Sequence, residues 1–364
     1  MSHQQYPEYP SLSSISASVK ETAKKAKLSN LILCYLDYHT NDADFAAMQA
    51  TNFKDTNILE VVHDLKHYGY DVEVPKNMAD FRENVYPSFI DIHARAGYHG
   101  LQVPVGSAPF KENGDLTEEA IKNLKKQKEI FEKAGLSFSA VGGCFTADWT
   151  QSIKPQIAAA NILGSDCLYG PFATVFMYFP EGVNSGDESV AWTKAQCKEF
   201  SKLMDDEIGP YAESKGVYLC DEPLQRFERM PIRLKEAVEM ALSTKSDRLK
   251  IMIDMCHEFC DGEGPELYEK LVKQLIEADR LQGLHISAVH RGKLYESWYT
   301  KEYFKSFFKP VFDGGYDGEI AIETFDAVLP VREAVKINRE KFSNPIGVLI
   351  NNLVYSATML EGLK

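Results

Sequence analysis

Four residues of types that bind divalent metals recur at a nearly regular spacing in the second half of the chain. They are Glu222, Asp254, His285 and Glu323, and consecutive members are separated by 32, 31 and 38 residues. Each lies within or directly after a short apolar run that is typical of a buried strand. One strand–helix unit of an eight-stranded α/β barrel takes roughly 30 residues, since about 250 residues make eight units. The spacing therefore predicts one ligand per unit, with the four side chains converging at one mouth of a barrel.

Three carboxylates and one imidazole form a ligand set for a single divalent ion. Taken alone, any of the four could cap a helix or lie in the core as a satisfied polar group. Together they need a cation, because neighbouring buried carboxylates repel one another and take up protons. The oxygen-rich set favours Mn²⁺, with Mg²⁺ or Co²⁺ as alternatives, over a thiolate-bound zinc. A metal-dependent enzyme is the first hypothesis, and the complete ligand set argues against a non-catalytic barrel subunit.

The rest of the chain alternates short apolar runs with amphipathic stretches, which predicts an α/β fold. The expected strands are 31–38, 100–105, 136–142, 166–172, 217–222, 250–255, 283–287 and 319–325. The clearest helices are expected over 117–135, 189–216 and 265–283, each with a capping residue or proline that marks one of its ends. This alternation fits both a closed barrel and an open doubly wound sheet. Because no G-x-G-x-x-G follows the first strand, we predict a (β/α)₈ TIM barrel.

The predicted domain organisation is simple. Residues 1–28 read as a polar lead-in, and residues 29–364 as a single TIM-barrel domain without a clear linker. The long polar segment 39–84 interrupts the first strand–helix unit and is expected to be an insertion on the barrel rim. Residues 330–364 are expected to form a C-terminal helical extension.

The negative net charge of the chain limits the classes of molecule that it is expected to bind. Lys and Arg number 40 and Asp and Glu number 53, so the formal charge is −13 at pH 7. Such a surface repels phosphate backbones and anionic lipids, and we expect neither nucleic acid nor membrane as a partner. No apolar stretch resembles a signal peptide or a membrane span, and the seven cysteines are scattered. We therefore expect a cytoplasmic protein with reduced thiols that acts on a small molecule. Barrels of this class often pair, so a homo-oligomer is compatible with the sequence.

Four segments of the second half carry a resemblance to a known family. They are 216–229 (GVYLCDEPLQRFER), 250–259 (KIMIDMCHEF), 284–292 (LHISAVHRG) and 314–325 (GGYDGEIAIETF). They resemble the xylose isomerase-like TIM-barrel sugar isomerases and epimerases, and most of all the ketose 3-epimerases of the D-tagatose and D-psicose type. The resemblance covers about the last 150 residues, and the first half resembles the family only in its general architecture.

This resemblance implies a function and a set of site residues. Glu222, Asp254, His285 and Glu323 would bind the metal; Glu228, His257 and Arg291 would contact a sugar substrate; and Phe325 would form part of the pocket wall. The implied reaction removes a proton next to a carbonyl and returns it by way of an enediolate. Two carboxylates, Glu222 and Glu323, suit the roles of base and acid.

Two other enzyme classes fit parts of the same pattern. Metal-dependent lyases or dehydratases that act on keto-sugars, keto-inositols or 3-keto-glycosides begin with the same proton abstraction, so the four ligands do not separate them from an epimerase. Phosphodiesterase barrels of the endonuclease IV type need further His ligands on the second and third strands. The expected strands 100–105 and 136–142 contain none. The acidic charge also disfavours a DNA substrate.

Overall fold

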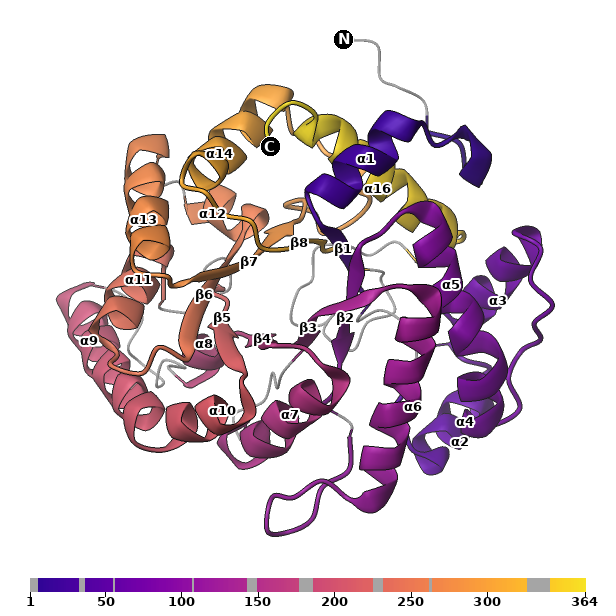
Figure 1. The fold of residues 1–364 in the computed structure, drawn as a ribbon, viewed down its shortest axis with the longest axis horizontal. Helices are drawn as coiled ribbons and strands as arrows, with labels where there is room; N and C mark the ends of the chain where they lie inside the picture. The colour runs from indigo at the N-terminus through magenta and orange to yellow at the C-terminus, as the bar shows by residue number, and fades with distance from the viewer. Residues whose placement is uncertain are drawn as a thin grey trace.

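The computed structural model describes most of the chain. The described residues are 6–32, 37–54, 56–106, 108–142, 149–176, 186–224, 232–261, 264–325 and 341–364. Eight parallel strands follow one another in chain order around a closed barrel, β1-β2-β3-β4-β5-β6-β7-β8. Helices surround the strands on the outside (Figure 1). This arrangement confirms the predicted (β/α)₈ TIM barrel.

The strands are short and sit close to the predicted runs. Their bounds are β1 Leu28–Leu31, β2 Gly100–Pro104, β3 Ser137–Gly142, β4 Cys167–Gly170, β5 Tyr218–Asp221, β6 Leu249–Asp254, β7 Leu281–Ile286 and β8 Ile320–Ile322. The first prediction was wrong in its bounds: the strand expected over 31–38 begins at Leu28 and ends at Leu31. The residues that pair with its neighbours lie upstream, since Leu28 pairs with Ile320 and Ser29 with Gly100.

The helices between the strands keep the order expected for βα repeats. The segment between β1 and β2 contains α2 (Asp42–Ala50), α3 (Ile58–His67), α4 (Met78–Asp80) and α5 (Tyr86–Ala96). The later repeats use α6 (Glu118–Ala134), α7 (Trp149–Leu163), α8 (Phe172–Phe176), α9 (Gly186–Leu203), α10 (Gly209–Lys215), α11 (Leu234–Ser243), α12 (Met255–Asp261), α13 (Pro265–Glu277) and α14 (Lys301–Asp313). Among the described helices, none is both long and apolar enough to cross a lipid bilayer.

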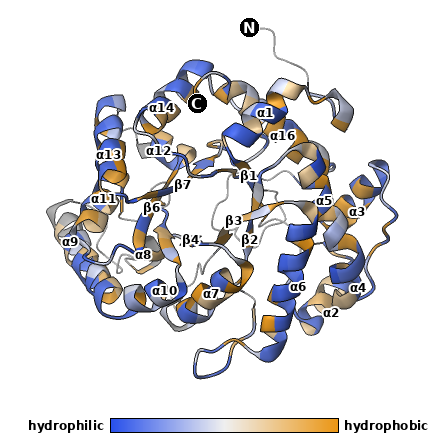
Figure 2. Cartoon of the chain, viewed as in Figure 1, coloured by the Kyte–Doolittle hydropathy of each residue, from blue (hydrophilic) through white to orange (hydrophobic). Residues whose placement is uncertain are grey.

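Local sequence explains why α6 forms where it does. The Thr117 hydroxyl accepts a hydrogen bond from the backbone N–H of Ala120, which caps the first turn. At the other end, Gly135 adopts a left-handed conformation with φ of 73°, which a residue without a Cβ reaches at little cost. Leu124 and Phe131 lie on the buried face, and the opposite face is polar. Figure 2 shows hydrophilic and hydrophobic stripes on the outer helices.

The first and last helices of the chain close the ring next to β1. Helix α1 (Ala17–Lys25) packs against α16 (Pro345–Leu360), and Figure 1 shows the two side by side. Helix α16 also packs against α3 and α14 and is buried along most of its length. Its position between β8 and β1 completes the layer of helices.

Side chains alternate between two cores, as a barrel requires. Strand residues that face the helices, such as Ile253, Leu284 and Ile286, belong to the large hydrophobic core. A second, smaller cluster contains Leu31, Ala140, Cys167, Tyr169, Cys220 and Met252. The polar residues described next follow this second cluster toward the carboxyl ends of the strands.

Candidate metal centre

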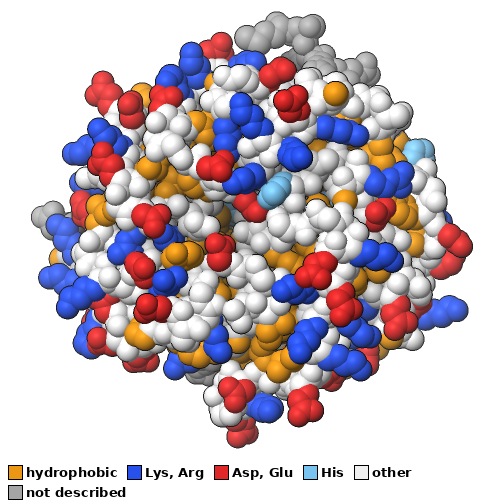
Figure 3. Space-filling view, in the orientation of Figure 1, with side chains coloured by type: hydrophobic (Ala, Val, Ile, Leu, Met, Phe, Trp, Pro, Cys, Tyr) orange, Lys and Arg blue, Asp and Glu red, His pale blue; other side chains and the backbone are white. Residues whose placement is uncertain are grey.

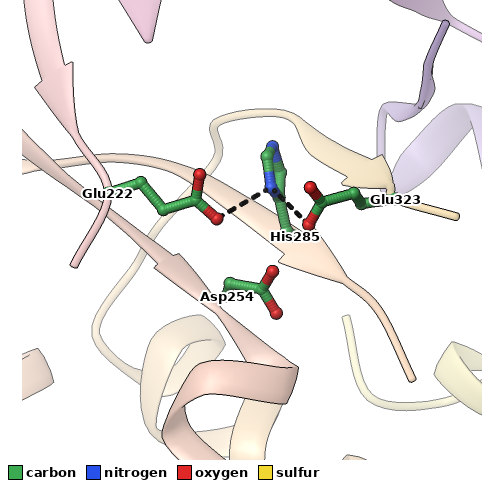
Figure 4. Close-up of side chains that lie close together, drawn as sticks. All are labelled: Glu222, Asp254, His285 and Glu323. Atoms are coloured by element: carbon green, nitrogen blue, oxygen red, sulfur yellow. Dashed lines mark ion pairs between the residues drawn. The ribbon is translucent and has the colours of Figure 1, made fainter. Parts of the chain in front are cut away.

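Strands β5 to β8 carry the four predicted ligands at their carboxyl ends. Asp254 is the last residue of β6 and His285 the last but one of β7, while Glu222 and Glu323 directly follow β5 and β8. Figure 4 shows the four side chains directed toward one another from these neighbouring strands. One potential ligand atom from each residue lies within 4.8 Å of the other three. The structure therefore brings together all four residues that the spacing predicted to converge.

The cluster is cut off from solvent. Each of the four residues is at most 4% exposed. The Nδ1 atom of His285 lies 3.5 Å from Oε1 of Glu222 and 3.3 Å from Oε2 of Glu323. Three acidic groups are thus held away from solvent, where water screens their mutual repulsion only weakly.

Two atoms of the cluster fit a bound cation. Within the described part of the chain, neither Glu222 Oε1 nor His285 Nδ1 has a hydrogen-bond partner, although both are buried. A buried polar atom without a partner costs free energy. Both atom types can donate a lone pair to a metal, and the two atoms face each other at 3.5 Å. The residues present therefore fit a divalent ion.

Arg291 supplies positive charge to the same cluster. Its Nη1 donates to Asp254 Oδ2 at 2.6 Å and to Glu323 Oε2, and the residue is only 2% exposed. Its Nη2 lies 2.8 Å from Nε2 of His257. The backbone of Arg291 has a φ of 56°, a left-handed conformation that residues other than glycine rarely adopt. Two backbone bonds hold it there: Arg291 N donates to Ala288 O, and its own O accepts from Phe325 N, each at 2.7 Å.

These charges shift the titration of the cluster. Burial alone would raise the pKa of Asp254, but Arg291 and His257 hold it well below its usual range. Burial raises the pKa of Glu323 to about 7, although Arg291 opposes the shift. Burial would lower the pKa of His285, yet the contacts with Glu222 and Glu323 outweigh it and raise the pKa to about 10. Without a cation, the cluster therefore holds a proton on His285 at neutral pH.

Three of the four residues predicted to surround the ligands lie beside the cluster. His257, on α12, has its Nε2 atom 3.8 Å from Glu222 Oε1 and 3.9 Å from Asp254 Oδ2. The ring of Phe325 lies against the Arg291 guanidinium, with its centroid 5.2 Å from the guanidinium carbon. Glu228 lies outside the described residues. The structure thus places His257, Arg291 and Phe325 beside the cluster.

Two further residues contact the ligands and were missed in the sequence. Ser287 donates its hydroxyl to Asp254 Oδ1, which also accepts from the backbone N–H of Cys256 at 2.6 Å. Gln102, on β2, has its Oε1 atom 2.9 Å from His285 Nε2. The sequence weakly predicts the position of Ser287. It follows His285 by two residues, and alternate residues along a strand point to the same face. No feature of the sequence predicts the contact of Gln102, because Gln102 and His285 are 183 residues apart.

Comparison with known families agrees with this geometry. The family model described as the xylose isomerase-like TIM barrel matches residues 62–341, which is more than half of the chain. The chain belongs to this family. The matched range includes all four residues of the cluster together with His257, Arg291 and Phe325. No curated protein sequence matches the chain.

Solved structures show where the fold of this family member recurs. A protein from Anabaena variabilis ATCC 29413, classed as a sugar phosphate isomerase/epimerase, is 24% identical over 77% of this chain and 93% of its own, with a TM-score of 0.62. The D-psicose 3-epimerase of Clostridium cellulolyticum H10, solved with D-tagatose, is 17% identical over 75% of this chain and 92% of its own, with a TM-score of 0.56. The 3-keto-D-glucoside 4-epimerase of E. coli is 16% identical over 69% of this chain and 91% of its own, with a TM-score of 0.50. At these identities the likeness is one of fold.

Proposed function

We propose that the chain is a divalent-metal-dependent sugar isomerase or epimerase that moves a proton on the carbon next to a carbonyl. The observation that carries this proposal is the buried cluster of three carboxylates and one imidazole whose ligand atoms lie within 4.8 Å of one another. Its place at the carboxyl ends of barrel strands supports the proposal, because TIM-barrel enzymes keep their active sites at that face.

Glu222, Asp254, His285 and Glu323 would hold one ion, with Mn²⁺ favoured and Mg²⁺ or Co²⁺ as alternatives. When bound, such an ion would polarise the substrate carbonyl and stabilise negative charge on its oxygen. The predominance of oxygen ligands supports these metals over zinc bound through sulfur.

Side chains of the protein itself would transfer the proton and bind the substrate. Glu222 and Glu323 come from β5 and β8, so two carboxylates are available to remove a proton and to return one. Arg291 and His257 would donate hydrogen bonds to substrate oxygens, where charge develops as the proton leaves. Phe325 would form an apolar wall of the pocket, and Glu228 keeps the role of substrate contact that the resemblance implies.

A free ketose is the substrate class that we propose to test first. Two solved structures of similar fold are named D-psicose 3-epimerase, one of them solved with D-tagatose and the other in the presence of D-fructose. A further one is named L-ribulose 3-epimerase. The sequence contains no evident glycine-rich phosphate-binding loop, so an unphosphorylated ketose with a hydroxyl on the carbon beside its carbonyl comes first in the search for a substrate.

Proton exchange tests the proposal directly. The purified chain is incubated with Mn²⁺ and a panel of free ketoses and 3-keto-sugars in D₂O, and products are separated by chromatography and analysed by mass spectrometry. We expect an epimer or isomer that carries one deuterium at the carbon next to the carbonyl, and none after treatment with EDTA. Loss of water or of an aglycone would instead identify a lyase. The absence of exchange and of product across the panel would contradict the proposal.

A further inference from the structure

One contact of the cluster crosses the interior of the barrel. The Oε1 atom of Gln102, on β2, lies 2.9 Å from Nε2 of His285, on β7. Strand β7 pairs with β6 and β8, so β2 is not its neighbour in the sheet. Both side chains are buried, with Gln102 3% and His285 0% exposed. The contact therefore arises from side chains that reach across the barrel and not from backbone pairing.

In the neutral imidazole, which is the form that binds a metal, this contact determines which ring nitrogen of His285 keeps its lone pair. An amide oxygen can only accept a hydrogen bond, so the bond to Gln102 requires a proton on Nε2. The other nitrogen, Nδ1, is the one that faces Glu222 and Glu323 at 3.5 and 3.3 Å. An imidazole that carries its single proton on Nε2 presents the Nδ1 lone pair to this space, as metal ligation requires.

We infer that Gln102 is a positioning residue that fixes the orientation and the proton position of His285 for metal ligation through Nδ1. The inference rests on the proposed metal centre and extends it to a strand on which the sequence pattern showed no functional residue. Hydrogen-bond partners of this kind hold a ligating ring in one tautomer and one orientation. Gln102 would act only through His285, without touching substrate or ion.

Gln102 also lines a cavity at the other end of the barrel. The cavity has a volume of about 370 Å³ and is bordered by Lys27, His99, Asp166 and Glu319, each within one residue of the first residue of a strand. Figure 3 shows this face of the molecule, where charged side chains and a histidine gather around the centre. The amide thus stands between this polar cavity and His285. Shortening it to alanine would give water access to Nε2, and water could replace the lost acceptor.

The test therefore needs a substitution that keeps the volume. Gln102→Leu fills the space but offers no acceptor, whereas Gln102→Glu keeps an acceptor oxygen at the same reach. Gln102→Asn keeps the amide and withdraws it by one methylene. Ser139→Ala is the matched control: Ser139 lines the same cavity from β3 and is 9% exposed, and its hydroxyl has no hydrogen-bond partner in the described part of the chain.

Mn²⁺ binding to the full chain, measured by isothermal titration calorimetry, is the primary readout. We expect Gln102→Leu to weaken Mn²⁺ binding about 10- to 100-fold, the range found for hydrogen-bond partners of metal ligands. Gln102→Glu and Ser139→Ala should stay within about threefold of the original chain, and Gln102→Asn should fall between. Thermal unfolding in EDTA should be similar for all four variants, because the effect lies in ligation and not in folding.

The outcomes separate this inference from the proposed function. If the original chain binds no divalent ion, the metal centre itself is wrong and the inference fails with it. If the original chain binds Mn²⁺ and Gln102→Leu binds it equally well, only the role of Gln102 is overturned. Should Gln102→Leu fail to fold, the comparison of Gln102→Asn with Gln102→Glu decides: equal affinity in these two variants contradicts the inference.

Discussion

Asp254 and His285 are directly paired residues of the neighbouring strands β6 and β7, so a carboxylate and an imidazole lie side by side at the end of the sheet. The next pairing sets His285 beside Ala321 of β8, which places Glu323 two residues further along that strand. Backbone hydrogen bonds of the barrel therefore hold these ligands near one another before any ion binds. Changes to their side-chain chemistry should leave the barrel itself intact, and this makes the site testable by substitution.

Replacing either acid–base candidate by its amide should stop turnover. Glu222→Gln and Glu323→Gln keep the shape of the side chain but remove its ability to take up a proton. Each should therefore lower kcat by about 10²- to 10⁴-fold. Steady-state kinetics on the substrate identified by proton exchange, with far-UV circular dichroism as the folding check, measures this. Glu319→Gln is the control, because Glu319 lies at the opposite end of β8 and accepts from Ser137 at 3.2 Å. Substantial activity in either of the first two variants would refute the two-carboxylate assignment.

Metal binding should release protons and strengthen as the pH rises. The pKa of His285 is raised to about 10 and that of Glu323 to about 7, so at neutral pH a cation must displace the proton on His285 and part of one on Glu323. Protonation competes with the ion, and the apparent affinity should therefore increase by about tenfold per pH unit near pH 8 and by more near pH 6, where Glu323 also carries a proton. Calorimetry in buffers of different ionisation enthalpy counts the protons released. The affinity of His285→Gln for the ion should depend less on pH. An affinity of the original chain that is the same at pH 6 and pH 8 would contradict the claim that the metal-free cluster is protonated.

Arg291 should stabilise the metal-free chain more than the metal-bound chain. Arg291→Ala leaves Asp254 and Glu323 buried without their cationic partner, a change that costs about 3–5 kcal/mol when one member of a buried pair is removed. Saturating Mn²⁺ should recover much of this loss, because the bound ion supplies positive charge at the same carboxylates. Unfolding measured in EDTA and in Mn²⁺ tests the difference.

Arg280→Ala provides the comparison for that experiment. Arg280 donates to the backbone carbonyls of Ser246, Leu249 and Thr244 and lies outside the cluster. Its loss should lower stability by a similar amount with and without Mn²⁺. If Mn²⁺ rescues both arginine variants equally, the special relationship between Arg291 and the two carboxylates is wrong.

The buried His93 should make the fold sensitive to acid. Burial lowers its pKa to about 4; its Nδ1 donates to Phe89 O at 2.7 Å, and its Nε2 accepts from Asn30 Nδ2 at 3.2 Å. In the unfolded chain its pKa returns to about 6.5, so between these values the unfolded state binds a proton that the folded state excludes. The contribution is fully present above pH 6.5 and is lost as the pH falls to 4, by up to about 3 kcal/mol. Urea unfolding between pH 7 and 4.5 should show a shallower pH dependence for His93→Gln, and parallel curves would contradict the assignment.

The sequence by itself determined the repeating architecture and the ligand set. Apolar runs that alternate with amphipathic stretches require a parallel α/β arrangement, because each element must bury one face. Once the units repeat about every 30 residues, ligands spaced by 32, 31 and 38 residues must lie at equivalent places on successive strands. Local spacing was therefore enough to predict that Glu222, Asp254, His285 and Glu323 meet, since neighbouring strands of the barrel are also consecutive in the chain.

Only the tertiary structure decided what surrounds that cluster. The strand expected over 31–38 lies instead at Leu28–Leu31, because pairing with β2 and β8 fixes the register and the apolar run LILCY does not. Arg291 turns its guanidinium onto Asp254 and Glu323 through a left-handed backbone that no spacing rule predicts. Gln102 reaches His285 only because the closed barrel brings β2 and β7 face to face across its interior. Contacts across a barrel depend on its closure, and closure is a property of all eight strands together.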